Sequence, residues 1–308
     1  MNPWARRNEG GSMAVKGVWG EGEPGEGRVR WSPKARTMTI GITLASLLAL
    51  SLLSASCGRR GGEEPGGESG PQDAGTGSTE LHNQFSFLVC GDPHGRTDLL
   101  ARIVSQAREG EFLVVLGDIS TGRGVEEMRR MRDFLDHCGM TYHVIPGDND
   151  MPGGSLKAFW EVFGPDYYSL DVQDTHLVFL DDAVPGVGCP PRELSWLRED
   201  LAGAYGKLII AFAHVPPGAP VDIGKGGFVA QESESNLEMR ELLAAAGVSA
   251  IYCGHIHAYM LYASGPPRVV VTGGAGAEPH LSPEGGGFHH FLRVTVEDGQ
   301  VREEVIAL

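Results

Sequence analysis

Short apolar runs alternate with amphipathic stretches from residue 82 to the last residue, 308, and this alternation predicts strands and helices in turn. The runs that read as buried strands are Phe85–Cys90, Phe112–Leu116, Thr141–Ile145, Thr175–Leu180, Leu208–Ala213 and Ser249–Cys253. The stretches with a helical period are Thr97–Arg108, Val125–His137, Leu156–Phe163, Pro191–Leu201 and Glu234–Ala246. Further strands are expected at Tyr259–Ala263, Arg268–Thr272, His289–Val296 and Val301–Ile306. One domain of mixed α and β elements, residues 82–308, is the simplest interpretation.

The residues before position 82 lack this alternation. Residues 38–57 have the layout of a signal peptide, because the apolar run Met38–Leu53 is preceded by basic residues and followed by small ones. An uncleaved membrane anchor is the alternative, since a run of roughly sixteen residues lies just below the usual spanning length of about 17 to 25. We interpret residues 1–37 as a disordered or mis-annotated N-terminus, and the Gly- and Glu-rich residues 58–81 as a flexible linker.

Cys57 directly follows the small residues, and this stretch resembles a bacterial lipoprotein signal. The resemblance implies that Cys57 becomes the lipidated first residue of the mature protein. It departs from the family pattern in one respect. An aliphatic residue usually lies three places before the cysteine, but here Ser54 holds that place and Leu53 lies one place further back. All of these interpretations place the folded domain outside the cytoplasm, either secreted or held at a membrane by a lipid or hydrophobic anchor.

Composition restricts the partners of the domain. Lys and Arg total 25 against 40 Asp and Glu, so the formal charge of −15 offers no broad attraction for a nucleic acid duplex. Any phosphate group must therefore be held by a local site. Among the five cysteines, Cys90 and Cys253 fall in predicted strands as small core residues, whereas pairing of Cys138 with Cys189 after export stays open.

Side chains that bind metals follow five of the predicted strands. They occur in Gly91-Asp92-Pro93-His94, Gly117-Asp118, Gly147-Asp148-Asn149-Asp150, Ala213-His214 and Gly254-His255-Ile256-His257. One Gly-Asp after a strand is usually only a turn. Together, however, these residues can converge, because ligands bind at the carboxyl ends of the strands in open α/β sheets. Three aspartates and four histidines favour transition metals, and two ions with a bridging carboxylate would use all seven.

The order and spacing of these motifs from Phe85 to Leu308 resemble those of the calcineurin-like metallophosphoesterases. The resemblance implies a mixed α/β (α+β) fold in which two packed β-sheets are flanked by helices. It also implies that the seven side chains hold two divalent transition metal ions, such as Mn, Fe, Zn or Ni. Carried over by position, the first ion would take Asp92, His94 and His257, the second would take Asp148, His214 and His255, and Asp118 would bridge them.

The implied reaction is hydrolysis of a small-molecule phosphate ester, either a phosphodiester or a small phosphomonoester. A hydroxide held between the two ions would attack phosphorus in line with the leaving oxygen. Asn149 would orient the phosphate, and the loop Pro216–Gln231 would lie on the substrate side. The glycines of Gly273–Gly276 are expected to let the backbone pass close to the metal edge.

One motif departs from the family, which usually has Asn followed by His where this chain has Asp148 and Asn149. In the family that histidine can protonate the leaving group, and asparagine cannot. General acid catalysis contributes about a hundred- to ten-thousand-fold. Substitute donors would be Asp150, His289 or His290. The alternative function is a catalytically weak domain that keeps the metals and binds a phosphorylated ligand.

Overall fold

A computed structural model describes residues 15–17, 84–218, 233–263 and 265–308. Strands form two sheets, with the orders β1-β5-β6-β7-β8-β10-β9 and β12-β11-β2-β3-β4. The strands are β1 Val15–Gly17, β2 Gln84–Cys90, β3 Leu113–Leu116, β4 Tyr142–Ile145, β5 Tyr168–Val172, β6 Thr175–Phe179, β7 Leu208–Ala213, β8 Ala250–Cys253, β9 Tyr259–Ala263, β10 Arg268–Thr272, β11 His290–Glu297 and β12 Gln300–Ala307. The helices are α1 Thr97–Val104, α2 Val125–His137, α3 Lys157–Val162, α4 Pro191–Gly203 and α5 Glu234–Ala245.

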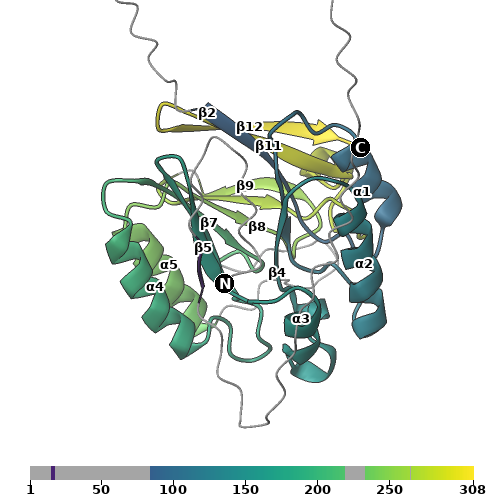
Figure 1. Cartoon of the computed structure of the whole chain (residues 1–308), viewed down its shortest axis with the longest axis horizontal. Helices are drawn as coiled ribbons and strands as arrows, with labels where there is room; N and C mark the ends of the chain where they lie inside the picture. The colour runs from purple at the N-terminus through teal and green to yellow at the C-terminus, as the bar shows by residue number, and fades with distance from the viewer. Residues whose placement is uncertain (1–14, 18–83, 219–232, 264) are drawn as a thin grey trace, which may run out of the picture. The chain divides into compact units, whose positions relative to one another are not determined.

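The two sheets pack face to face, with helices on the outer side of each (Figure 1). Phe87 of one sheet meets Phe212 of the other edge to face, with ring centroids 5.9 Å apart, inside the core between the sheets. Leu197 and Leu243, from α4 and α5, pack on the outside of the seven-stranded sheet. The apolar faces of α1, α2 and α3 cover the five-stranded sheet in the same way. The predicted two-sheet sandwich flanked by helices is confirmed.

Parallel pairing brings the ends of several strands to one edge. Strands β2, β3 and β4 run parallel in one sheet, and β6, β7, β8 and β10 run parallel in the other. Strands β3, β7 and β8 are buried almost throughout, and β2 and β4 are buried in their carboxyl halves, which explains why these strands appear in the sequence as apolar runs. Their carboxyl ends therefore present the loops that carry the predicted metal-binding residues.

The predicted elements are confirmed with small shifts at their ends, apart from three differences, which concern the end of α1 and the unpredicted strands β5 and β1. The prediction that the first helix reaches Arg108 was wrong, because α1 ends at Val104. Strand β5 was not predicted at all, although Tyr168, Leu170 and Val172 alternate with polar residues and face the core between the sheets. Apart from β1, which pairs with β5, residues 1–83 lie outside the described part. The predicted linker and export segment, with Cys57, therefore stay predictions.

A buried ionic network joins α4 to strands β5 and β6. The ring of His176, which is 3% exposed, lies between Asp171 Oδ1 at 2.7 Å and Asp200 Oδ2 at 2.8 Å. Ser169 donates a hydrogen bond to Asp200, and Lys207 pairs with Asp171. Burial alone would lower the pKa of His176, but the two carboxylates raise it above its ordinary value. The network therefore favours a positively charged imidazole.

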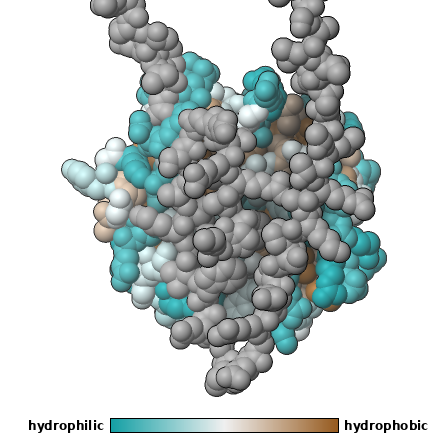
Figure 2. Space-filling model, viewed as in Figure 1, coloured by the Kyte–Doolittle hydropathy of each residue, from teal (hydrophilic) through white to brown (hydrophobic). Residues whose placement is uncertain are grey.

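The described surface on the face shown in Figure 2 is mostly hydrophilic, as expected when the apolar sides of the helices face the sheets. Among the described residues, no helix combines the length and the apolar character needed to span a membrane. Cys90 and Cys253 are buried core residues, as predicted. Cys138 and Cys189 are both free, so the possible disulfide between them is absent.

Candidate metal centre

The structure brings all seven predicted ligand residues together at the carboxyl edge of the two sheets. One ligand atom from each member of a group lies within 4.8 Å of the others in that group. The groups are Asp92, His94 and His257; Asp148, His214 and His255; and Asp92, Asp118 and His214. Asp118 lies between the first two groups, since it contacts His94 on one side and His214 on the other. The first two groups contain the residues predicted for the two ions, and the bridging role of Asp118 stays a prediction.

Two histidines are oriented by backbone carbonyls. The Nδ1 atom of His214 lies 2.8 Å from the Leu116 carbonyl oxygen, and that of His257 lies 2.8 Å from the Glu278 carbonyl oxygen. A carbonyl only accepts hydrogen bonds, so Nδ1 donates its proton in each ring, and Nε2 is the nitrogen that a metal ion could take. Each Nε2 faces a carboxylate, Asp148 at 3.1 Å for His214 and Asp92 at 3.5 Å for His257.

The remaining ligands complete the two groups. His94 places Nε2 3.1 Å from Asp118 Oδ2, and its ring meets that of His257 edge to face. His255 places Nδ1 3.1 Å from the same Asp148 oxygen that His214 approaches. The backbone N–H of His255 donates to both oxygens of Asp92, at 3.1 and 2.9 Å. This last contact connects the two groups through the main chain.

Four of these residues have a left-handed backbone, with φ of 59° at Asp92, 44° at His94, 50° at Asp118 and 64° at His255. Such a conformation costs a residue with a side chain about 1–2 kcal/mol. Strained residues of this kind cluster at functional sites, where the surrounding structure holds them in place. The turns after β2, β3 and β8 therefore hold the ligands in conformations that free loops rarely adopt.

Glycines let the backbone approach the aspartates. A Cβ atom on Gly273 would lie 2.7 Å from Asp92 Oδ2, and one on Gly147 would overlap Asp118 Oδ1. Only glycine fits at these two places without moving a carboxylate. The expectation that Gly273–Gly276 pass close to the metal edge is confirmed at Gly273.

The electrostatics of the centre favour bound cations. Burial would lower the pKa of His214, but the surrounding carboxylates raise it well above its ordinary value. Burial likewise opposes ionisation of Asp118, yet the charge of His214 and the hydrogen bond from His94 hold its pKa below the ordinary value. A field that attracts protons to imidazoles also attracts metal ions, which would replace those protons.

Asn149 lies against the carboxylate shared by the two groups. Its backbone N–H donates to Asp118 Oδ1 at 2.9 Å, and its side-chain amide donates to Asp118 Oδ2 at 2.6 Å. The predicted role of Asn149 in orienting a phosphate stays a prediction. Its observed contacts fix the side chain against Asp118, between the two groups.

The three candidate proton donors are bound within the protein. Burial raises the pKa of Asp150 to about 7, while its carboxylate accepts hydrogen bonds from Gly147, Ile119 and Ser120. His289 and His290 both direct Nδ1 at carbonyl oxygens, and His290 is fully buried. Asp150 thus connects the loop after β4 to the loop after β3, which is a structural role.

Sequence reasoning missed Asp182, although it follows the end of β6 as the predicted ligands follow other strands. Its carboxylate is buried and accepts the backbone N–H of His214 at 2.8 Å and that of Val215 at 3.1 Å. Burial raises the pKa of Asp182 to about 6, and the charge of His214 opposes this rise. Asp182 therefore holds in place the turn that carries His214.

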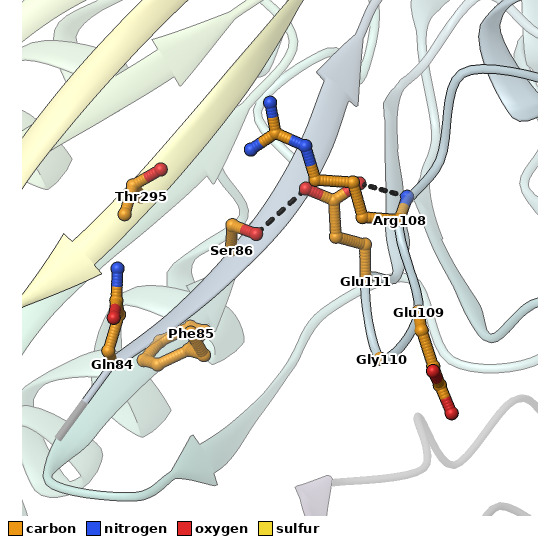
Figure 3. A pocket seen from close by; sticks show the side chains of 8 residues that line it. All are labelled: Gln84, Phe85, Ser86, Arg108, Glu109, Gly110, Glu111 and Thr295. Carbon is orange, nitrogen blue, oxygen red and sulfur yellow. Dashed lines mark hydrogen bonds between the residues drawn. The ribbon is translucent and has the colours of Figure 1, made fainter. Parts of the chain in front are cut away.

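A cavity of about 320 Å³ at the other end of β2 contains none of the predicted ligands (Figure 3). Its wall includes Glu111, which accepts hydrogen bonds from Ser86 at 2.7 Å, from the Arg108 N–H at 2.7 Å and from Arg293 at 2.9 Å. These contacts satisfy the carboxylate, so the cavity is a structural feature of the sheet edge.

Comparison with known proteins agrees with this geometry. The sequence profile of calcineurin-like phosphoesterases matches residues 85–259, which include β2 and every predicted ligand. The chain belongs to the calcineurin-like phosphoesterase family. Members of this family use two divalent metal ions, and the groups around Asp118 offer ligands for two. The donors fit such ions, because the first two groups each combine two imidazole nitrogens with a carboxylate and their ligand atoms lie within 4.8 Å of one another.

Two curated relatives share part of this chain. Probable glycerophosphodiester phosphodiesterase GpdQ of Arcobacter nitrofigilis is 27% identical over 162 residues, covering 48% of this chain and 56% of that protein. Purple acid phosphatase 22 of Arabidopsis thaliana is 28% identical over 198 residues, covering 56% of this chain and 44% of that protein. The chain thus spans about half the length of these two relatives.

Solved structures share the fold at low identity. Purple acid phosphatase PPD1 from yellow lupin superposes with a TM-score of 0.59 at 13% identity, covering 73% of this chain and 51% of that one. GAP50, the anchor in the inner membrane complex of Plasmodium, superposes with a TM-score of 0.56 at 12% identity, covering 73% of this chain and 84% of that one. At such identities the likeness concerns the fold alone.

Proposed function

We propose that this protein hydrolyses phosphate esters, either phosphodiesters or small phosphomonoesters, at a dinuclear metal centre. The observation that carries the proposal is the meeting of two Asp/His groups around Asp118. The names of the two curated relatives, one a phosphodiesterase and one an acid phosphatase, support an ester hydrolase without choosing between the two ester types.

In this proposal Asp92, His94 and His257 hold one ion, Asp148, His214 and His255 hold the other, and Asp118 contacts both. When bound, the two ions supply Lewis acidity to the phosphoryl oxygens and lower the pKa of water toward neutrality. The protein supplies rigid positions for the ligands, through the strained turns after the strands and through Asp182 behind the His214 turn. Asn149 binds and orients the phosphate.

A second candidate is a metal-containing domain that binds a phosphorylated ligand and turns it over weakly. The position of Asn149 favours this alternative, because an amide cannot give up a proton to a leaving group. The engagement of Asp150 with backbone N–H groups supports it further, since this carboxylate is unavailable as a substitute donor.

We also propose that the domain works outside the cytoplasm, secreted or anchored at a membrane through Cys57 or the apolar run before it. This proposal rests on the sequence of residues 38–57 alone. In a bacterial host, full-length protein should sediment with membranes, and Cys57→Ser should release it if the lipid is the anchor. Retention of the variant in the membrane fraction would instead support an uncleaved apolar anchor.

The hydrolase proposal is tested with p-nitrophenyl phosphate and bis(p-nitrophenyl) phosphate, assayed on the full chain with added Mn²⁺. We expect turnover of at least one ester, and its loss by about a hundredfold or more in Asp118→Asn, because the shared ligand loses its charge. Asp133→Asn, an exposed aspartate on α2, is the matched control and should retain activity. Bound metal without turnover of either ester would favour the binding alternative.

A further inference from the structure

A cavity of about 520 Å³ opens beside two of the predicted ligands, Asp148 and His255. Its other walls come from the loop after β6, from Val215 after β7 and from residues 233–235 at the start of α5. A group attached to a phosphate at the metal centre can therefore extend into this cavity.

The loop after β6 and the start of α5, which both line the cavity, are held together. Asn236, which is 2% exposed, accepts the backbone N–H of Cys189 at 2.8 Å and donates to the Asp182 carbonyl at 3.1 Å. A side chain at Gly188 would overlap Ser233 and Asn236, so the loop and the helix start are in close contact. The cavity is thus largely formed before any ligand binds.

The lining is acidic and partly apolar. Val184, Val187 and Val215 supply apolar surface, and among the described residues no lysine or arginine lines the cavity. Three carboxylates line it, but Asp148 belongs to the predicted metal ligands and Asp182 is occupied by backbone N–H groups. Glu234 is exposed, and no described residue pairs with its carboxylate.

We propose that this cavity binds the organic substituent of the phosphate ester and that Glu234 makes it select a substituent carrying an ammonium group on a short aliphatic chain. The apolar valines would contact the chain, and Glu234 would attract the cation. This inference rests on the proposed hydrolase function. An anionic substituent is disfavoured, because no lysine or arginine in the described lining offsets its negative charge.

Two diesters that differ only in charge test the selection. p-Nitrophenyl phosphocholine carries a trimethylammonium group, and p-nitrophenyl 3,3-dimethylbutyl phosphate carries a neutral tert-butyl group of the same shape. Both release p-nitrophenolate, so the leaving group is constant. On the full chain with Mn²⁺ we expect kcat/KM to favour the choline ester about fivefold, the size of one solvent-exposed ion pair, and this ratio to fall with added salt.

The preference should disappear in Glu234→Gln and reverse in Glu234→Lys. Glu241→Gln, an exposed glutamate further along α5, is the matched control and should keep the fivefold ratio. Equal kcat/KM for the two esters, or a preference that survives Glu234→Gln, would overturn the inference.

Failure of the hydrolase proposal is distinguishable, because neither ester would then be hydrolysed in an Asp118-dependent way. In that case the same two esters are compared by titration calorimetry with the intact chain. Tighter binding of the choline ester that is lost in Glu234→Gln would still support the selection, and equal affinities would overturn it.

Discussion

Replacing Asn149 with histidine should restore a proton donor beside the phosphate. The Asn149 amide lies 2.6 Å from Asp118 Oδ2, and its oxygen faces Gly122, whose missing side chain leaves room for a larger ring. An imidazole at this position can keep a hydrogen bond to Asp118 and present its other nitrogen to a leaving group. We therefore expect Asn149→His to gain general acid catalysis.

The expected gain depends on the leaving group. An alkoxide leaves poorly unless it is protonated, so the gain on an alkyl ester should reach about a hundredfold, the lower end of the general-acid range and about 2.7 kcal/mol of barrier. p-Nitrophenolate leaves well without a proton, so the gain on an aryl ester should be small. The alkyl rate should also fall as pH rises through the pKa of the new histidine, ordinarily about 6.5.

Diethyl phosphate and ethyl p-nitrophenyl phosphate provide the comparison, because both yield ethyl phosphate, which phosphorus NMR quantifies. Asn149→Gln is the control, since it lengthens the side chain and keeps an amide. A variant that retains its metal and gains nothing on the alkyl ester, or gains equally on both esters, would refute the reasoning.

Three further changes probe the supporting structure. Asp182→Leu leaves backbone N–H groups after β7 buried without an acceptor, at about 1–3 kcal/mol each, so chemical denaturation should show a loss of several kcal/mol, whereas Asp182→Asn should lose less. His176→Leu should destabilise the fold by about 3–5 kcal/mol because the buried carboxylate of Asp200 loses its ion pair and keeps only the hydrogen bond from Ser169. The raised pKa of His176 contributes stability that is fully present below pH about 6.5 and is lost as pH rises through the pKa of His176 in the folded protein. The lowered pKa of Asp171 contributes stability that is lost in acid. In denaturation curves, the unaltered chain should therefore lose the His176 contribution as pH rises above about 6.5, and His176→Leu should not. The same pH dependence in both proteins would contradict the assignment. Gly147→Ala should lower the affinity for Mn²⁺ at least tenfold by displacing Asp118, and unchanged affinity would contradict the close approach.

Much of the fold was predictable because its parallel strands are buried on both faces. Such strands appear as continuous apolar runs, as in Leu208–Ala213, and the prediction placed that strand at the observed residues. The sequence analysis missed strand β5 because it is short and its apolar residues alternate with Ser169 and Asp171, so it contains no continuous run of apolar residues. A search for two-residue alternation over five positions would have found it.

At the metal centre, the predicted ligand residues could be found because they follow strand ends. The groups that hold those residues in place by hydrogen bonds could not be predicted. The ligand motifs are local in sequence, and the parallel topology brings them together. The carbonyl of Leu116, however, is 98 residues from the His214 ring that it orients, and a backbone atom has no residue type to recognise. Asp182 carried the same strand-end signal as the ligands, but its partner is a backbone N–H group and its role is visible only in three dimensions.

Metal content tests the central claim most directly. Elemental analysis of the full chain, purified without chelators and reloaded with Mn²⁺, should give about two ions per chain. His257→Ala and His214→Ala each remove a ligand from a different group, so each should reduce the content to about one while circular dichroism shows a retained fold. No bound metal in the unaltered chain, or two ions retained in both variants, would contradict a centre built by these residues.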